Sequence, residues 1–510
     1  MNKLKEKLSS LNRKGRLTST SVTALLLGLV IVINVIVYVC TVNFNLYLYS
    51  TDDYDLTISG STDAFFADDL GAGKKVTVLF CDSKDTIETS SDEVHFFHET
   101  ALQFAERYPE LIELEYVNII TKRDSSGNIV ENLQDYRTVG EDGTVYPLYN
   151  TSVIFISDKN HRVIHDVASS VFSSNRNNSS TVTHTSYNGE EVFASMVSWV
   201  LGSEHKTAYF TTYHGEIVDV AFANMLSCSG YDIKTIDLRK NEIPEDAGVI
   251  IISNPKKDFE RAAEGSGSRS EIEKLREYMQ DGGRLYVAID PYVKKLTVLE
   301  EFVSEFGITI SESETESGMV KNIVKDRSNA ITTDGFTIVA EMADNDFCTT
   351  IADKIASYTD RNVIIESCAA LELNSGSNAI PILVTSDNSF TYADGEETNA
   401  DGNYCIAAKG SYTNKEGVTG EIFVVPSIFL TANDALVNSG YANRNFIYSL
   451  IDEAFGADEV PYGCNVIYMN TGVLENLTMG TARVYTAFIL AIPVAIAIFG
   501  AVVTIRRKNR

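Results

Sequence analysis

Gly248-Val-Ile-Ile-Ile-Ser253 is a continuous apolar run near the middle of the chain. A run of this length without polar alternation is typical of a parallel strand that is covered on both faces. Strand patterns also occur at 207–212 and 284–289, and a helical pattern at 271–280 precedes the second of them. This alternation of strands and helices predicts a doubly wound α/β domain over residues 205–458.

Two later strand patterns extend this predicted domain. The runs Ile380-Pro-Ile-Leu-Val-Thr385 and Gly420-Glu-Ile-Phe-Val-Val-Pro426 fit the same sheet. Residues 311–378 separate them from the earlier strands and begin with a Ser/Glu-rich stretch. We therefore expect residues 311–378 to form an insertion in the domain.

Residues 50–202 predict a second, smaller α/β domain with a thioredoxin-like layout. Its strand and helix patterns lie, in order, at 75–81, 93–108, 112–118 and 151–157. The chain contains no C-x-x-C pair, so the layout does not predict redox activity. The polar stretch 173–186 is interpreted as a loop.

Charge-free apolar segments lie near both ends of the chain. No charged residue occurs between Arg16 and Asp52, and a second charge-free run follows Arg483. About 20 apolar residues in a helix cross a hydrocarbon core of about 30 Å. The sequence therefore predicts transmembrane helices at 21–42 and 484–505, the second joined to the body by a linker at 459–483.

The distribution of charge predicts an orientation for these helices. The net charge of the whole chain is −28. The tails 1–20 and 506–510 carry charges of +5 and +4, so the residues between them carry a net charge of −37. Basic segments beside membrane helices stay in the cytoplasm. We expect a bacterial membrane protein with two spans, cytoplasmic termini and an extracytoplasmic body. The acidic body argues against nucleic acid as a partner, because phosphate binding needs clustered cations.

Polar residues follow the predicted strands at their carboxyl ends, where open α/β sheets bind ligands. They form a predicted rim for a ligand or partner: His214, Glu216, Asn254, Asp290, Asp387 and Ser427. One interpretation is a hydrolase that uses His214, Glu216 and Asp290 in acid–base roles. The other is that Gly, Pro, Asn and Asp occur there because turns require them. We prefer the second interpretation.

Sequence motifs for catalysis and cofactor binding are missing. There is no G-x-x-x-x-G-K-[ST] phosphate loop and no G-x-[SC]-x-G nucleophile turn. The pair His95-x-x-His98 lacks the glutamate of a zinc helix and is expected on a mostly exposed helix face. The sequence thus predicts no catalytic residue, no cofactor and no metal, and we expect the protein not to be an enzyme.

Several segments in the same order are similar to one family, the GldG-like auxiliary subunits of ABC-type transport systems, which are associated with gliding motility. The matching segments are Tyr209-Phe-Thr-Thr-Tyr-His-Gly-Glu216, Gly230-Tyr-Asp-Ile, Ile243-Pro-Glu-Asp246, Val249-Ile-Ile-Ile-Ser-Asn-Pro255, Gly282-Gly-Arg-Leu-Tyr-Val-Ala-Ile-Asp-Pro291 and Leu490-Ala-Ile-Pro493. One departure is Tyr213, where the family often has Gly before His-Gly-Glu.

The resemblance implies a separate permease and a separate ATPase as partners. It also implies that the larger domain resembles the glutamine-amidotransferase fold, without its catalytic triad. We therefore expect a non-enzymatic auxiliary subunit of an ABC-type transport system, whose body assembles with these partners and could engage the substrate. The alternatives are the membrane-anchored hydrolase and a structural or sensory ectodomain without a transporter.

Overall fold

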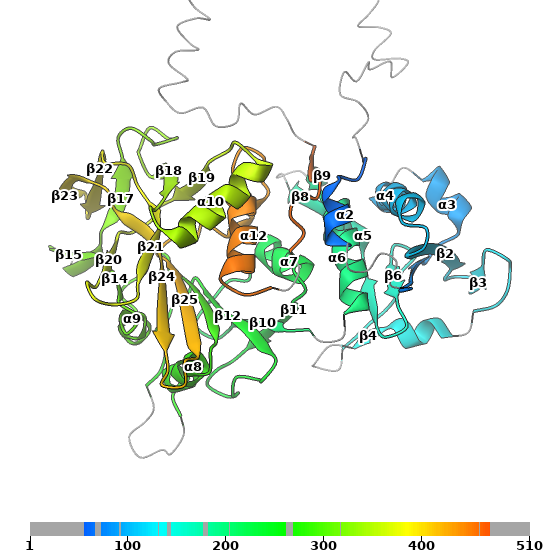
Figure 1. Ribbon diagram of the computed structural model, residues 1–510, viewed down its shortest axis with the longest axis horizontal. Coiled ribbons are helices and arrows are strands. Elements are labelled where there is room, and N and C mark those ends of the chain that lie inside the picture. The colour runs from blue at the N-terminus through cyan, green and yellow to red at the C-terminus, as the bar shows by residue number, and fades with distance from the viewer. Residues whose placement is uncertain are drawn as a thin grey trace, which may run out of the picture. The chain divides into compact units, whose positions relative to one another are not determined.

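The computed structural model describes residues 56–66, 73–90, 93–130, 132–139, 144–176, 182–202, 205–261, 269–316, 318–457 and 460–469. All of them belong to one compact unit. They form a mixed α/β structure that contains two principal sheets (Figure 1).

The larger sheet has eleven strands, and nine of them follow one another in the order β11-β10-β12-β13-β25-β24-β21-β18-β19. Their bounds are Asp232–Ile236, Thr207–Thr211, Ala247–Ser253, Arg284–Ala288, Thr419–Val425, Cys405–Thr413, Ile380–Val384, Thr337–Met342 and Val363–Glu366. The two others are β14, Ile308–Ile310, and β20, Leu371–Leu373, which pair with each other, and β20 also pairs with β24. The strands predicted at 380–385 and 420–426 are thus confirmed as members of this sheet.

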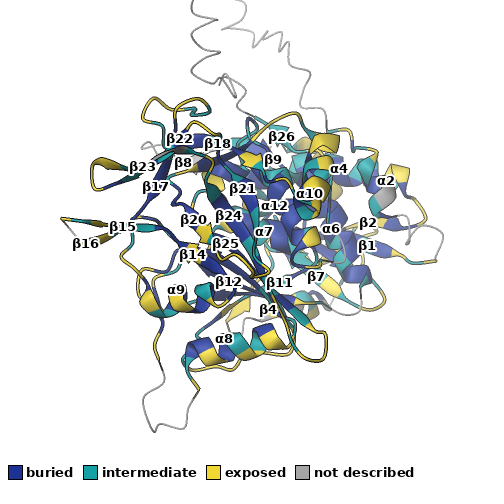
Figure 2. Cartoon of the chain, turned by 60° about the vertical axis from the view of Figure 1, so that its left-hand side comes forward, coloured by how far each residue is buried: buried dark blue, intermediate teal, exposed yellow. Residues whose placement is uncertain are grey.

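Helices cover both faces of this sheet, which explains the apolar run of β12. Val249 and Ile251 pack in one core cluster, with α7 (Val220–Cys228), α10 (Asp346–Tyr358) and α12 (Asn443–Glu453). Ile250 and Ile252 pack in another, with α8 (Glu271–Gln280) and α9 (Thr297–Ser304). Successive side chains of a strand point to opposite faces, so each face of β12 needs apolar residues. Figure 2 shows these strands largely in the buried colour.

The direction of the strands changes across the sheet. The five strands from β11 to β25 are parallel, and β24 is antiparallel to β25. The sequence predicted an insertion at 311–378, but β18, β19 and β20 from this range belong to the main sheet. Other described strands of this range lie in two small sheets. In one, β15 (Glu312–Thr315) pairs with β16 (Gly318–Lys321), and in the other, β17 (Ile323–Asp326) joins β22 (Ser389–Ala393) and β23 (Glu396–Gly402) from beyond the range.

The smaller principal sheet has the order β3-β2-β1-β6-β7, with bounds Arg123–Asp124, Ile112–Asn118, Val76–Phe80, Val153–Ile156 and His161–Ile164. β1 and β2 are parallel, and β6 and β7 form an antiparallel pair beside β1. The helices of this part are α2 (Ser61–Phe65), α3 (Lys84–Thr89), α4 (Glu93–Arg107), α5 (Val167–Val171) and α6 (Gly189–Leu201), with a 3-10 turn at Asn132–Tyr136. A short pair, β4 (Thr138–Val139) and β5 (Val145–Tyr146), lies between β3 and β6 in sequence.

Two segments that were interpreted as loop and linker contain strands. The stretch 173–186 overlaps β8 (Phe172–Arg176) and β9 (Val182–Tyr187), which pair antiparallel. The predicted linker 459–483 contributes β26 (Ile467–Tyr468), which pairs with β9. Polar side chains dominate β8 and β9, and β26 has only two residues, so a rule based on apolar alternation does not detect these strands.

The predicted fold class needs one correction. In the described part of the chain, no helix is both long and apolar enough to cross a membrane. The longest one, α4, has 15 residues, which at 1.5 Å per residue span about 23 Å of a core about 30 Å thick. The predicted spans 21–42 and 484–505 lie outside the described residues. The structure is therefore a mixed α/β fold, and the described residues support neither two transmembrane helices nor the bacterial-membrane localisation inferred from them.

The close packing of α8 on β25 can be tested by a substitution at Gly420 of β25. A Cβ atom on Gly420 would lie 2.0 Å from the carbonyl oxygen of Met279. Because backbone atoms block the space, we expect Gly420→Ala to lower the free energy of unfolding by about 1–3 kcal/mol. Urea denaturation would measure it. Gly60→Ala is the matched control, since a Cβ there meets no atom within 4 Å, and it should stay within about 0.5 kcal/mol of the native protein. Equal stability of the two variants would contradict the packing.

Candidate functional site

The predicted rim residues lie where the sequence pattern placed them, at the carboxyl ends of strands. Four of the strands, β10, β12, β13 and β25, are neighbours in the sheet. They bring together His214, Glu216, Asn254, Asp290 and Ser427. Asp387 follows β21, which is separated from β25 by β24, and its side chain is exposed. The structure therefore groups five of the six predicted residues and leaves Asp387 apart.

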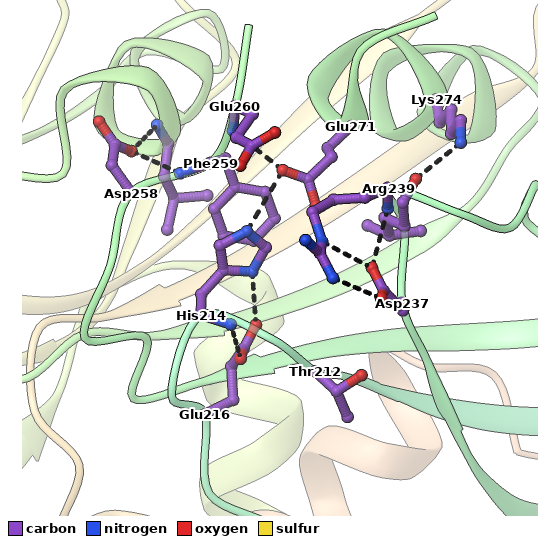
Figure 3. Close-up of polar contacts among 12 residues, drawn as sticks. Thr212, His214, Glu216, Asp237, Arg239, Asp258, Phe259, Glu260, Glu271 and Lys274 are labelled. Atoms are coloured by element: carbon purple, nitrogen blue, oxygen red, sulfur yellow. Dashed lines mark hydrogen bonds and ion pairs between the residues drawn. The ribbon is translucent and has the colours of Figure 1, made fainter.

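His214 is the centre of a buried polar cluster (Figure 3). Its Nδ1 lies 3.0 Å from Oε1 of Glu216, and its backbone N–H donates to Oε2 of the same carboxylate at 2.7 Å. On the other side of the ring, Nε2 lies 3.2 Å from Oε2 of Glu271, an ion-pair distance without the alignment of a hydrogen bond. The ring also stacks on Phe259, with 4.1 Å between the ring centroids. The imidazole is thus enclosed on three sides.

The cluster connects three segments of the chain. Carbonyl oxygen of His214 accepts from the backbone N–H groups of Lys256 and Lys257 at 2.7 and 2.9 Å. Glu271, the first residue of α8, also accepts from the N–H of Glu260 at 2.9 Å. The loop after β10, the loop after β12 and the start of α8 are therefore held to one another through the His214 side chain and backbone.

Solvent does not reach the charged atoms of this cluster. The side chains of His214, Glu216 and Glu271 are only 2%, 2% and 3% exposed. Burial disfavours a charged imidazole, but the two carboxylates outweigh it and raise the pKa of His214 to about 9. Burial also disfavours the charge on Glu216, and hydrogen bonds led by that from His214 lower the pKa of Glu216 nonetheless. A histidinium held between two carboxylates is a structural ion cluster that a substrate cannot contact in this arrangement.

Two more rim residues, Asp290 and Ser427, are also engaged within the protein. One carboxylate oxygen of Asp290 pairs with Nζ of Lys256 at 2.7 Å, and the other accepts from the N–H of Tyr292 at 2.9 Å. Ser427 is fully buried, and its hydroxyl donates to the carbonyl oxygen of Glu366 at 2.7 Å. These side chains fix the loops after β13 and β25.

Backbone strain occurs at this edge of the sheet. Tyr213 has a φ of 94°, Asn254 one of 59° and Ser367 one of 48°. Residues with a side chain rarely adopt such values, and the cost is of order 1–3 kcal/mol each. Asn254 is also buried, and its Oδ1 has no hydrogen-bond partner among the described residues. The tight turns that close this edge are therefore held by the contacts around them.

Sequence reasoning missed two members of the His214 cluster, Glu271 and Phe259. A local signal was present for α8, because Ser270 and Glu273 form a capping box at its start. That motif predicts where the helix begins but says nothing of which distant side chain faces Glu271. The predicted exposure of His98 was wrong. Its side chain is fully buried in α4, and its Nε2 lies 2.7 Å from the hydroxyl of Tyr116.

Large apolar side chains are exposed at the same edge, beside the closed polar cluster. We call this set the rim patch: Tyr213, Ile217, Val218, Val220, Tyr292 and Ile428, with exposures from 36% to 65%. They lie on the loops after β10, β13 and β25 and at the start of α7. Exposed apolar side chains that gather in this way mark surfaces that contact another molecule.

Comparisons with known proteins give no assignment. No family model matches the chain, and no curated protein matches it. Similar solved structures include the N-terminal domain of mmIFT52, with 16% identity, a TM-score of 0.37 and coverage of 49% of this chain and 99% of that chain. A putative ThuA-like protein from Bacteroides uniformis has 13% identity and a TM-score of 0.30, with coverage of 51% of this chain and 95% of that chain. PurLQS from Thermotoga maritima has 12% identity and a TM-score of 0.26, with coverage of 49% of this chain and 98% of that chain. At such TM-scores these likenesses carry no argument.

The His214 cluster predicts a pH dependence of stability. The folded pKa of about 9 exceeds the ordinary value of 6.5, so the stabilisation is complete below pH 6.5 and is lost as the pH rises through about 9. We expect the native protein to have a higher free energy of unfolding than His214→Gln at pH 6.5. This difference should shrink by about 3 kcal/mol as the pH rises from 6.5 to 9.

Chemical denaturation at a series of pH values would measure this difference. Substitution of the exposed His161 by Gln is the control and should leave the pH profile of the native protein unchanged. Parallel profiles for the native protein and His214→Gln would contradict the charged cluster.

Proposed function

We propose that the chain is a non-catalytic auxiliary component of an ABC-type transport system, which assembles with a separate permease and a separate ATPase. The observation that carries this proposal is the state of the carboxyl edge of the large sheet. There the side chains of His214, Glu216, Asp290 and Ser427 make internal contacts, and several large apolar side chains are exposed.

The closed cluster favours a structural over a catalytic role for this edge. A general acid or base must come within hydrogen-bond reach of the group that it protonates or deprotonates. His214 has one ring nitrogen against Glu216 and the other against Glu271, and all three side chains are at most 3% exposed. Asp290, the third residue of the hydrolase interpretation, pairs with Lys256. The hydrolase is therefore the weaker candidate.

The rim patch supplies the surface for assembly. Interfaces between proteins gain most of their affinity from a few buried apolar and aromatic anchors. Tyr292 and Val220 are 65% and 59% exposed, so both have area to bury on a partner. Their supporting loops are fixed by the His214 cluster and by Asp290, so little order has to be imposed on binding.

The nature of the partner comes from the sequence resemblance to the GldG-like auxiliary family. The segments that carry it include Tyr209-Phe-Thr-Thr-Tyr-His-Gly-Glu216 and Gly282-Gly-Arg-Leu-Tyr-Val-Ala-Ile-Asp-Pro291. Both of them end in loops of the carboxyl edge, and they contain Tyr213 of the rim patch. The resemblance and the exposed surface thus concern the same part of the structure.

Co-expression of the full chain with an ABC-type permease and ATPase from the same organism, followed by co-purification, would test the proposal. We expect a complex with the native chain, and recovery at least about ten-fold lower for the double variant Ile217→Asp with Val220→Asp, since two apolar side chains of the rim patch become charged. Val220 is the first residue of α7, where an acidic side chain suits the helix dipole, so the fold should persist.

Met319→Asp is the matched control, because Met319 is 57% exposed but lies in β16, outside the rim patch. It should leave recovery unchanged. If the native chain recovers neither protein, the proposed function is wrong. If the double variant recovers them as well as the native chain, assembly does not use the rim patch.

A further inference from the structure

An acidic side chain, Asp219, stands among the apolar side chains of the rim patch. Its neighbours in sequence are Ile217, Val218 and Val220, which are 48%, 39% and 59% exposed. Asp219 itself is only partly exposed. It is the N-cap residue of α7, but its side chain makes no capping hydrogen bond. The helix therefore does not account for the presence of a carboxylate at this position.

The carboxylate of Asp219 has no ionic or hydrogen-bonding partner among the described residues, and its oxygens remain open to solvent. Burial raises the pKa of Asp219 to about 6, as happens when a carboxylate loses water and no cation compensates the loss. Its charge does act on Tyr286, whose pKa is raised chiefly by burial and further by Asp219. This interaction leaves the negative charge of Asp219 unneutralised.

The lysines of the neighbouring loop, which follows β12, are directed to other groups. Nζ of Lys256 pairs with Asp290 at 2.7 Å. Nζ of Lys257 lies 5.9 Å from the centre of the Tyr213 ring. Neither lysine forms an ion pair with Asp219, so the described part of the chain supplies no cation to this carboxylate.

An interface over the rim patch changes the energy of this carboxylate. When the apolar side chains around Asp219 are covered, the water that still reaches its oxygens is removed. A charge that loses its water without gaining a partner opposes association. A cation on the opposite surface compensates for that loss, because charges attract more strongly where solvent is excluded. The partner that fits the rim patch therefore carries a cation among apolar side chains.

We infer that Asp219 anchors a lysine or arginine side chain of the partner protein, which inserts among the apolar side chains of the rim patch. The inference rests on the proposed assembly and adds to it the chemistry of the partner surface, a basic side chain with apolar neighbours. A partner surface that is apolar throughout leaves Asp219 unpaired, and an acidic surface is repelled by it.

Asp219→Asn tests the inference, because it removes the charge and keeps the size and shape of the side chain. Asparagine and aspartate are about equally good N-cap residues, so α7 should form as in the native chain. Biolayer interferometry in detergent would measure the affinity of the purified full chain for the co-expressed permease–ATPase complex. We expect Kd to rise at least about 30-fold, as is typical when one member of a desolvated ion pair is lost.

Two further measurements distinguish an interface contact from a structural role. The free energy of unfolding of Asp219→Asn should equal or exceed that of the native chain, because a neutral amide loses less on burial than an unpaired carboxylate. An increase in NaCl from about 50 to about 300 mM should weaken binding of the native chain more than binding of the variant.

Two other variants complete the set. Asp219→Glu retains the charge and should bind more tightly than Asp219→Asn. Asp158→Asn is the matched control, because Asp158 is an exposed carboxylate between β6 and β7 of the smaller sheet. It should leave Kd unchanged.

The possible results separate the inference from the proposed function. If the native chain does not bind the permease–ATPase complex, the proposed function is wrong and the inference falls with it. If the native chain binds and Asp219→Asn binds equally well or more tightly, the assembly stands and the inference is wrong, because the partner offers no cation to Asp219. If Asp219→Asn loses both affinity and stability, Asp219 has a structural role, and this result also overturns the inference.

Discussion

The ion pair between Glu191 and Arg444 joins the two sheet-bearing parts of the structure. Glu191 belongs to α6, which packs in the core of the smaller sheet, and Arg444 belongs to α12, which packs on the larger one. Burial raises the pKa of Glu191, and the guanidinium of Arg444 opposes this shift. Removing one partner of such a pair leaves an uncompensated buried charge and typically costs about 3–5 kcal/mol. The pair therefore imposes one arrangement of α6 and α12.

This constraint has consequences for the segments at either end of the described chain. Glu190 and Glu191 are neighbours near the start of α6, so the same turn of the helix carries both carboxylates. Glu190 then receives hydrogen bonds from Ser59 at one end and Asn465 at the other. The end segments 56–66 and 460–469 are therefore both tied to α6 through the carboxylate of Glu190.

Much of the fold could be predicted from the sequence, because many of its strands and helices have a recognisable local sequence pattern. β12 is covered on both faces and reads as an uninterrupted apolar run, and α8 has the complete 271–280 extent that its helical spacing predicted. Prediction failed where stabilisation comes from partners distant in sequence. The polar strands β8 and β9 carry no apolar alternation, and they are held by pairing with each other and with β26.

The sequence could likewise predict some features of the candidate site and not others. Position along a parallel sheet is a topological property, so the sequence could predict that His214, Asn254, Asp290 and Ser427 lie at one edge. Burial and partner choice are not topological. The carboxylate of Glu271 reaches His214 across 57 residues of sequence, and no spacing rule connects a helix start with a strand end at that separation. The sequence therefore could not predict whether the side chains of the rim are exposed or buried. That difference decides between the catalytic and the structural interpretation.

Tyr213 combines a strained backbone conformation with an exposed side chain. Its φ of 94° is a value that glycine adopts freely and a residue with a side chain rarely does. The backbone N–H and the ring of His214 both contact the carboxylate of Glu216, and these contacts hold the turn that follows Tyr213. Keeping a tyrosine there costs backbone strain, and what it provides is a large side chain that is 51% exposed beside Ile217 and Val220. The strained turn after β10 thus places a large aromatic side chain at the surface of this edge of the sheet.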